Sequence, residues 1–138
     1  MKVLFVCLGN ACRSQMAESI ARKVGADVME AFSAGVTPLG FVPIETTDTI
    51  VKNGYSADDL TCKGLNADLC DSADLIINMS GVPREDAFGN YSKVEDWTVD
   101  DPYHRDLKVY QRIFEDIETR IGELAERLRD GYVVEEKV

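Results

Sequence analysis

At the start of the chain, an apolar run leads through a tight loop into an amphipathic segment, and this order leaves few folds open. Residues 2–6 read as a buried strand, and residues 7–13 include glycine and asparagine, which tolerate unusual backbone angles. Ser14 can cap the helix that follows, and Gly25 ends it. The order of strand, loop and helix predicts the start of a β-α-β unit.

The remaining segments alternate in the same way. Their apolar spacing predicts strands at 28–33, 74–79 and 94–97 and helices at 43–53 and 106–129. The positions expected on the buried face of the first of these helices are Ile44, Thr47, Ile50 and Val51. Strands that alternate with helices indicate an α/β fold of three layers, in which helices flank a four-stranded, mostly parallel sheet.

The length and charge of the chain limit what it can be. Its 138 residues, 45% of them hydrophobic, suffice for one core and not for two, so residues 1–138 are expected to form a single domain. The net charge of −10 would repel nucleic acid and anionic membranes, and neither is expected as a partner. The acidic end at Glu135 and Glu136 is expected to be a solvated terminus.

The chain contains four cysteines, and an even number raises the question of a disulfide framework. The apolar run at residues 3–6 is too short for a secretory signal, so a cytoplasmic location and reduced thiols are expected. The cysteine spacing also lacks the close pairs typical of zinc sites, so no metal and no other cofactor are expected. Cys62 and Cys70 are expected to be structural.

The loop at residues 7–14 reads Cys-Leu-Gly-Asn-Ala-Cys-Arg-Ser and lies where a strand ends and a helix begins. Ligands of open α/β sheets bind at that place, and backbone N–H groups at a helix N-terminus favour a tetrahedral oxyanion. Arg13 adds a fork of donors, and the same donors would stabilise a nucleophilic thiolate at Cys7, with a further hydrogen bond from Ser14. The expected phosphate-binding residues are Leu8, Gly9, Asn10, Ala11, Cys12 and Arg13.

This loop, with residues 17–18 (Ala-Glu) and 33–35 (Ser-Ala-Gly) behind it, resembles the low-molecular-weight protein tyrosine phosphatase superfamily. That superfamily also contains thioredoxin-coupled arsenate reductases. The resemblance extends over nearly the whole chain in length and element order. It implies that Cys7 is a nucleophile that forms a phosphocysteine, and that Arg13 and the loop amides bind the phosphoryl oxygens.

A proton donor is also needed, because phosphoryl transfer to sulfur expels an alkoxide or phenoxide. The residues alone leave Asp96, Asp100, Asp101 and Asp106 as near-equal candidates. The resemblance selects Asp101, because its Asp-Pro dipeptide matches the general acid of the family. Asp100 would then be the neighbour whose negative charge favours a protonated Asp101.

The resemblance also assigns the walls of a pocket. Tyr103 resembles the aromatic residue that borders the phosphatase pocket, and Leu8 would line the opposite side. A flat aromatic wall suits an aryl phosphate ester. His104 stands where many family members have a second aromatic residue, and we expect it on the surface.

The two activities of the superfamily differ in how the modified cysteine is discharged. Thioredoxin-coupled reductases have a cysteine pair after the strand that corresponds to 74–79, whereas here Ser80 opens that segment and no cysteine follows Cys70. A reductase of this kind would need an external thiol, for example thioredoxin. Gln15, after Ser14, is closer to the arsenate reductases, and Tyr103 is closer to the phosphatases.

The predicted function is therefore hydrolysis of a phosphomonoester of the phosphotyrosine type, in a phosphorylated protein or a small ester. Arsenate reduction with an external thiol is the main alternative. A non-catalytic oxyanion-binding or redox-sensor module is a second alternative, although such a module would not need Asp101. Cys12 is interpreted either as a small loop residue or as a partner that protects Cys7 through a reversible disulfide, as in some phosphatases of the family.

Overall fold

The computed structural model describes residues 1–89 and 92–131, so the predicted acidic end at Glu135 and Glu136 lies outside the described residues. Its centre is a four-stranded sheet in the order β2-β1-β3-β4, with every neighbouring pair parallel. The strands are β1 (Lys2–Cys7), β2 (Glu30–Gly35), β3 (Leu75–Asn78) and β4 (Val94–Asp96). The helices are α1 (Arg13–Val24), α2 (Ile44–Lys52), α3 (Ala67–Ser72), α4 (Arg84–Phe88) and α5 (Leu107–Arg129).

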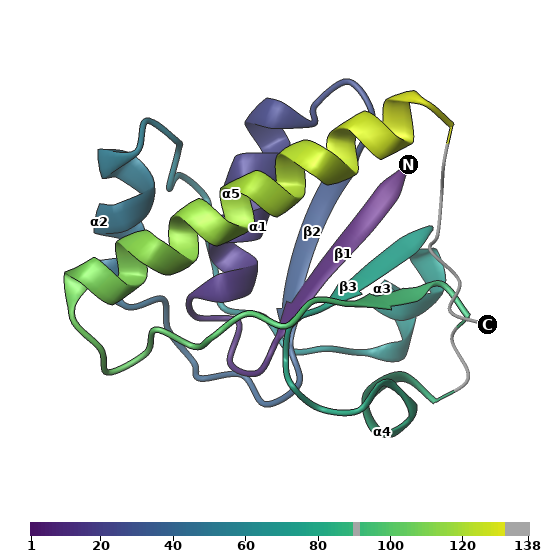
Figure 1. Cartoon of the computed structure of the whole chain (residues 1–138). Coiled ribbons are helices and arrows are strands. Elements are labelled where there is room, and N and C mark those ends of the chain that lie inside the picture. The colour runs from purple at the N-terminus through teal and green to yellow at the C-terminus, as the bar shows by residue number, and fades with distance from the viewer. Residues whose placement is uncertain (90–91, 132–138) are drawn as a thin grey trace.

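Helices cover both faces of the sheet, which confirms the predicted three-layer α/β fold. Figure 1 shows α1, α2 and α5 on one side of the strands and α3 and α4 on the other. Side chains of β1 alternate between the two layers, because successive residues of a strand point to opposite faces. Phe5 joins the larger core with α1 and α5, and Leu4 and Val6 join a smaller core with Cys70 and Phe88.

Helix α5 matches its prediction most closely. Asp106 is its N-cap, and both its side chain and its main-chain carbonyl accept from the Val109 N–H group, one of the first-turn N–H groups that have no acceptor four residues earlier in the helix. The buried stripe that follows has helical spacing and packs against α1 and α2. Its members are Tyr110, Ile113, Phe114, Ile117, Ile121, Leu124 and Ala125.

The second strand begins later than the sequence pattern predicts. Instead of 28–33, the strand is β2, from Glu30 to Gly35. The N–H groups of Val28 and Met29 both donate to the carbonyl of Gly25, which keeps them in the turn after α1. The chain joins the sheet only at Glu30, whose N–H group donates to the Met1 carbonyl.

The predicted buried face of α2 is confirmed at Ile50 and is wrong at Ile44 and Val51. Ile44 and Val51 are 68% and 60% exposed, whereas Thr46, Thr49 and Ile50 are buried. The inner face of α2 is partly polar because it lies against the loop after β1, where the Thr46 hydroxyl donates to the Ala11 carbonyl. A pattern search that places apolar residues inside misses such a face.

The helices α3 and α4 are absent from the sequence prediction. They have 6 and 5 residues, too few for a helical period to stand out. The side chain of Asn66 caps α3 by accepting from the Leu69 N–H group, and Pro83 precedes α4. None of the helices within the described residues is long and apolar enough to cross a membrane.

Candidate active site

The loop between β1 and α1 lies at the carboxyl end of the sheet, in close contact with the end of β2. We call residues 7–14 the cradle loop. Asn10 has a left-handed φ of 49°, and Gly35 lies directly against the loop backbone. A Cβ atom on Gly35 would come within 2.7 Å of the Asn10 nitrogen, so only glycine permits this approach.

Each carbonyl group of the cradle loop from Cys7 to Cys12 accepts a hydrogen bond. Main-chain N–H groups of Val36, Thr37, Leu39 and Met16 donate to the carbonyls of Cys7, Leu8, Gly9 and Cys12, in that order. The side chains of Gln15 and Thr46 donate to the carbonyls of Asn10 and Ala11. In a trans peptide the N–H group points away from the carbonyl before it. The N–H groups of residues 8–13 donate to no acceptor within the described part of the chain, which leaves them free for an oxyanion.

Cys7 is the side chain at the base of this loop, and it is 2% exposed. Its Sγ lies 2.9 Å from Ser14 Oγ, the contact that the sequence predicts. Asn10 Nδ2 donates to Ser14 Oγ at 2.7 Å, which leaves the Ser14 hydroxyl free to donate its own hydrogen bond to Cys7 Sγ. Such a hydrogen bond stabilises a thiolate. Ser14 is therefore not the predicted helix cap; the N-cap of α1 is Cys12, without a side-chain cap bond.

Arg13 is buried and held from several sides. Its Nη1 donates to the carbonyls of Met79 and Val99 at 2.6 and 3.1 Å, and its Nη2 lies 3.6 Å from Asp101 Oδ2. The Nε group is buried and has no hydrogen-bond partner among the described residues. A buried N–H group without a partner is costly unless a ligand accepts from it, and an oxyanion in the cradle would do so.

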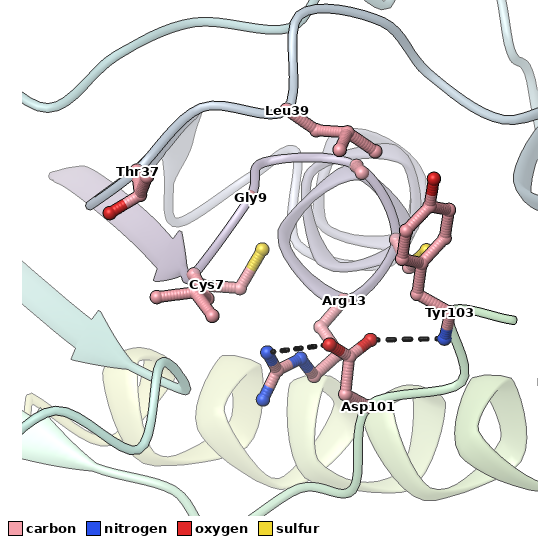
Figure 2. Close-up of a pocket in the computed structure, with 10 residues that line it drawn as sticks. Cys7, Gly9, Arg13, Thr37, Leu39, Asp101 and Tyr103 are labelled. Atoms are coloured by element: carbon pink, nitrogen blue, oxygen red, sulfur yellow. Dashed lines mark hydrogen bonds and ion pairs between the residues drawn. The ribbon is translucent and has the colours of Figure 1, made fainter.

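These groups surround a cavity of about 150 Å³, which opens to solvent (Figure 2). The residues that line it are Cys7, Leu8, Gly9, Ala11, Cys12, Arg13, Thr37, Leu39, Asp101 and Tyr103. In Figure 2, Cys7 and Asp101 lie on opposite sides of the cavity, with Leu39 and Tyr103 at its rim. The geometry thus brings together most of the residues that the sequence singles out.

The structure differs from the predicted set in several places. Asn10 does not line the cavity, because its carboxamide contacts Ser14, Gln15 and Lys63 behind the loop. Thr37 and Leu39 line it without having been predicted. They follow β2 and arrive there through hydrogen bonds to the cradle loop, so no local motif marks them.

The acidic candidates separate clearly in space. Asp101 lines the cavity, and its Oδ1 accepts from the Tyr103 N–H group at 3.1 Å. Asp96 binds Arg84, Asp106 caps α5, and Asp100 faces Arg112 across 3.6 Å. Asp100 is thus not among the described residues that line the cavity, and its carboxylate pairs with a cation of α5, contrary to the expected support of Asp101.

Tyr103 is half-buried at the rim, as predicted, and His104 is exposed beside it. The two rings lie 3.9 Å apart between centroids, and His104 has a left-handed φ of 66°. The expected surface position of His104 is confirmed. Among the described residues, no three His, Cys, Asp or Glu side chains gather in a way that could hold a metal ion.

Cys12 lies in the same cavity as Cys7 but in a different environment. Burial raises the pKa of the Cys12 thiol, although hydrogen bonds with Thr46 and Tyr110 partly offset this effect. The Tyr110 hydroxyl lies 3.6 Å from the Cys12 sulfur, and burial raises the pKa of Tyr110 as well. Cys12 is therefore a neutral thiol at neutral pH, and its disulfide with Cys7 stays a prediction.

The comparisons with known proteins agree with this geometry. Residues 2–133 match the family described as low molecular weight phosphotyrosine protein phosphatase. Arsenate reductase 1 of Bacillus cereus is 31% identical over 126 residues, covering 90% of this chain and 93% of that protein. A low molecular weight protein tyrosine phosphatase from T. tengcongensis has a TM-score of 0.81 at 32% identity, covering 92% of this chain and 99% of that one. The YwlE arginine phosphatase from Geobacillus stearothermophilus has a TM-score of 0.85 at 26% identity, covering 94% of each chain. This chain belongs to the low molecular weight phosphotyrosine protein phosphatase family.

Proposed function

We propose that this chain hydrolyses phosphate monoesters through a phosphocysteine at Cys7. The observation that carries the proposal is the form of the cavity. The N–H groups of residues 8–13, in the loop that borders it, donate to no acceptor among the described residues, and the side chains of Leu8, Leu39 and Tyr103 line the cavity. A bare oxyanion needs only these N–H groups, whereas an ester places its organic group against such walls.

The chemistry has two steps. The Cys7 thiolate attacks phosphorus, the ester P–O bond breaks, and Asp101 gives its proton to the departing oxygen. Water then attacks the phosphocysteine, Asp101 takes a proton from that water, and the P–S bond breaks to release phosphate and the thiolate. The cradle amides and Arg13 stabilise the negative charge on the phosphoryl oxygens in both steps.

An aryl phosphate of the phosphotyrosine type is the proposed substrate, either in a phosphorylated protein or in a small ester. The Tyr103 ring supports this choice, because aromatic rings pack favourably at the edge or offset on one another. The solved relative from T. tengcongensis is named a tyrosine phosphatase. The one from Geobacillus stearothermophilus is named an arginine phosphatase, so a phosphoarginine substrate belongs in the same test.

Arsenate reduction is the second candidate, since the relative from Bacillus cereus is named an arsenate reductase. Arsenate is a tetrahedral oxyanion like phosphate and fits the same cradle. Among the described residues, only Cys12 joins Cys7 at the cavity, while Cys62 donates to the Gly9 carbonyl behind the loop and Cys70 lies in the core under α3 and α4. A reductase would therefore use an external thiol, such as thioredoxin, to discharge Cys7.

The deciding experiment measures two reactions on the same preparation. Hydrolysis of p-nitrophenyl phosphate, a phosphotyrosine peptide and a phosphoarginine peptide tests the phosphatase. Loss of arsenate in the presence of thioredoxin, glutaredoxin or a small thiol tests the reductase. Cys7→Ser should abolish turnover, and Cys70→Ser is the matched control, because Cys70 is buried on the opposite face of the sheet.

Each outcome selects one function. Ester hydrolysis that is lost in Cys7→Ser and kept in Cys70→Ser supports the proposal. Arsenate reduction without ester hydrolysis assigns the reductase instead. Phosphate binding with neither reaction would leave an oxyanion-binding module and would overturn the enzymatic proposal.

A further inference from the structure

The carbonyl groups of the cradle loop are not all held by the same kind of donor. Those of Cys7, Leu8 and Gly9 each accept from a main-chain N–H group of the segment after β2, so each keeps a donor that does not depend on a side chain, and the Gly9 carbonyl also accepts from Cys62 Sγ. The carbonyls of Asn10 and Ala11 accept instead from the side chains of Gln15 and Thr46. At these two peptides, the amino-acid type decides whether the neighbouring N–H group faces the oxyanion.

Of these two side-chain donors, Gln15 lies in α1, directly after the loop, whereas Thr46 comes from the separate helix α2. Thr46 is fully buried on α2, and its Oγ1 lies 2.9 Å from the Ala11 oxygen. Ala11 is only 5% exposed, so water cannot readily replace the hydroxyl.

Helix α2 is fixed at its other end, which gives the Thr46 hydroxyl a defined position. The carboxamides of Asn53 and Gln111 exchange two hydrogen bonds, of 2.8 and 2.9 Å, between the end of α2 and α5. At the start of α2, the Thr46 N–H group donates to the Pro43 carbonyl at 3.0 Å. Helix α2 is therefore hydrogen-bonded to α5 at one end and to the cradle loop at the other.

We propose that Thr46 is a positioning residue of the oxyanion cradle. Its hydroxyl holds the Ala11 carbonyl away from the cavity, and the planar trans peptide then turns the Cys12 N–H group towards the phosphoryl oxygens. Without the hydroxyl, the buried Ala11 carbonyl has lost its donor, and the peptide gains by rotating towards another one. The inference deepens the proposed function and rests on its oxyanion site.

The chain offers matched variants for the test. Thr46→Val keeps the shape of the side chain and removes the hydroxyl, whereas Thr46→Ser keeps the hydroxyl and should restore wild-type behaviour. Thr49→Val is the control, because Thr49 is buried one turn further along α2 and its hydroxyl donates only to the Glu45 carbonyl of the same helix.

Binding of inorganic phosphate, followed by calorimetry, is the primary measurement. Thr46→Val should bind phosphate about 10- to 100-fold more weakly, the range expected for one hydrogen bond to a charged group. In amide NMR spectra, phosphate should shift the Cys12 N–H resonance in wild type, Thr46→Ser and Thr49→Val, and leave it nearly unmoved in Thr46→Val. A purely structural role would change the melting temperature without this selective loss.

The outcomes separate this inference from the proposed function. Wild-type phosphate affinity in a folded Thr46→Val protein would overturn the role of Thr46. If that variant does not fold, Thr46→Ala replaces it, because alanine removes the hydroxyl without placing a methyl group against the carbonyl, and the same criterion applies. Phosphate binding without ester hydrolysis would overturn the phosphatase proposal while still testing Thr46.

Discussion

The two segments that form the candidate site are built in opposite ways. In the cradle loop, Cys7, Asn10 and Arg13 are 2%, 0% and 6% exposed, and every carbonyl from Cys7 to Cys12 has a donor. In the segment from 97 to 106, which we call the acid loop, the Asp101 side chain is 47% exposed. An oxyanion is bound best by fixed dipoles, whereas a proton donor must exchange protons with water and with a leaving group.

Trp97 and Val99 of the acid loop pack into the larger core, and arginine side chains contribute further polar contacts to the loop. Arg13 donates to the Val99 carbonyl and lies beside Asp101, while Arg120 donates to the Thr98 carbonyl. The loop follows β4, the edge strand of the sheet, and precedes α5. Arg13 is thus the residue that joins the rigid segment to the exposed one, and its substitution should disturb both.

Arg13→Lys should have the largest effect. Lysine keeps the charge but cannot donate to Met79 and Val99 while also presenting a free Nε group. We expect ester turnover to fall about 1,000-fold, as when a main oxyanion donor is lost. Arg112→Lys is the control, since Arg112 pairs with Asp100 outside the cavity. Turnover close to wild type in Arg13→Lys would show that charge alone suffices.

Asp101→Asn tests the acid loop separately. We expect turnover of phenyl phosphate to fall about 100-fold, because phenoxide needs a proton as it leaves. The loss should be much smaller for p-nitrophenyl phosphate, whose leaving group is a weaker base. Asp100→Asn should leave both rates nearly unchanged, because Asp100 faces Arg112. Equal losses for the two esters would argue against proton donation by Asp101.

Gly35→Ala tests the rigidity of the cradle loop. The new Cβ would lie 2.7 Å from the Asn10 nitrogen and 2.8 Å from the Gly9 carbonyl carbon, so backbone must move. We expect a loss of about 1–3 kcal/mol in the free energy of unfolding, measured by urea denaturation, with weaker phosphate binding. Gly122→Ala, in open space on α5, should instead stabilise by up to about 1 kcal/mol. A neutral Gly35→Ala would mean that the loop yields easily.

The pH dependence of stability should show the smallest effect. Burial raises the pKa of Cys12 above its ordinary 9.0 and that of Tyr110 above its ordinary 10.0. The folded protein then holds these protons more tightly than the unfolded chain, so their contribution is complete below the ordinary values and is lost as pH rises. We expect the free energy of unfolding to fall at alkaline pH by about 1 kcal/mol per pH unit for each group. When the free energy of unfolding is measured by urea denaturation at several pH values, it should fall less steeply with pH in Tyr110→Phe than in wild type. An equal pH dependence in the two proteins would contradict this assignment.

The sequence predicted much of the fold because most of its elements carry a strong local signal. The apolar stripe from Tyr110 to Ala125 has helical spacing along its whole length, and α5 forms as expected. The start of β2 differs from the prediction because hydrogen bonds of Val28 and Met29 to Gly25, and not their apolar character, decide where the turn ends. The short helices α3 and α4 had too few residues to carry a period.

The residues of the candidate site also differ in whether a local sequence pattern predicts them. The place of Cys7 and Arg13 at the junction of β1 and α1 is a local property, so the motif alone located it. Asp101 was distinguished from its neighbours only by the resemblance to a family, and the packing of the acid loop shows why it alone reaches the cavity. The catalytic roles of these residues remain predictions for the experiments above.

The order of strands and helices and the loop that can bind an oxyanion can therefore be read from the amino-acid sequence, because both follow from neighbouring residues. The groups that complete the site are brought there by tertiary packing. Thr37 and Leu39 reach the cavity through pairing with the cradle loop, and Thr46 reaches Ala11 from α2. These contacts join segments far apart in the chain, and their geometry is fixed by packing and hydrogen bonding, which no local pattern records.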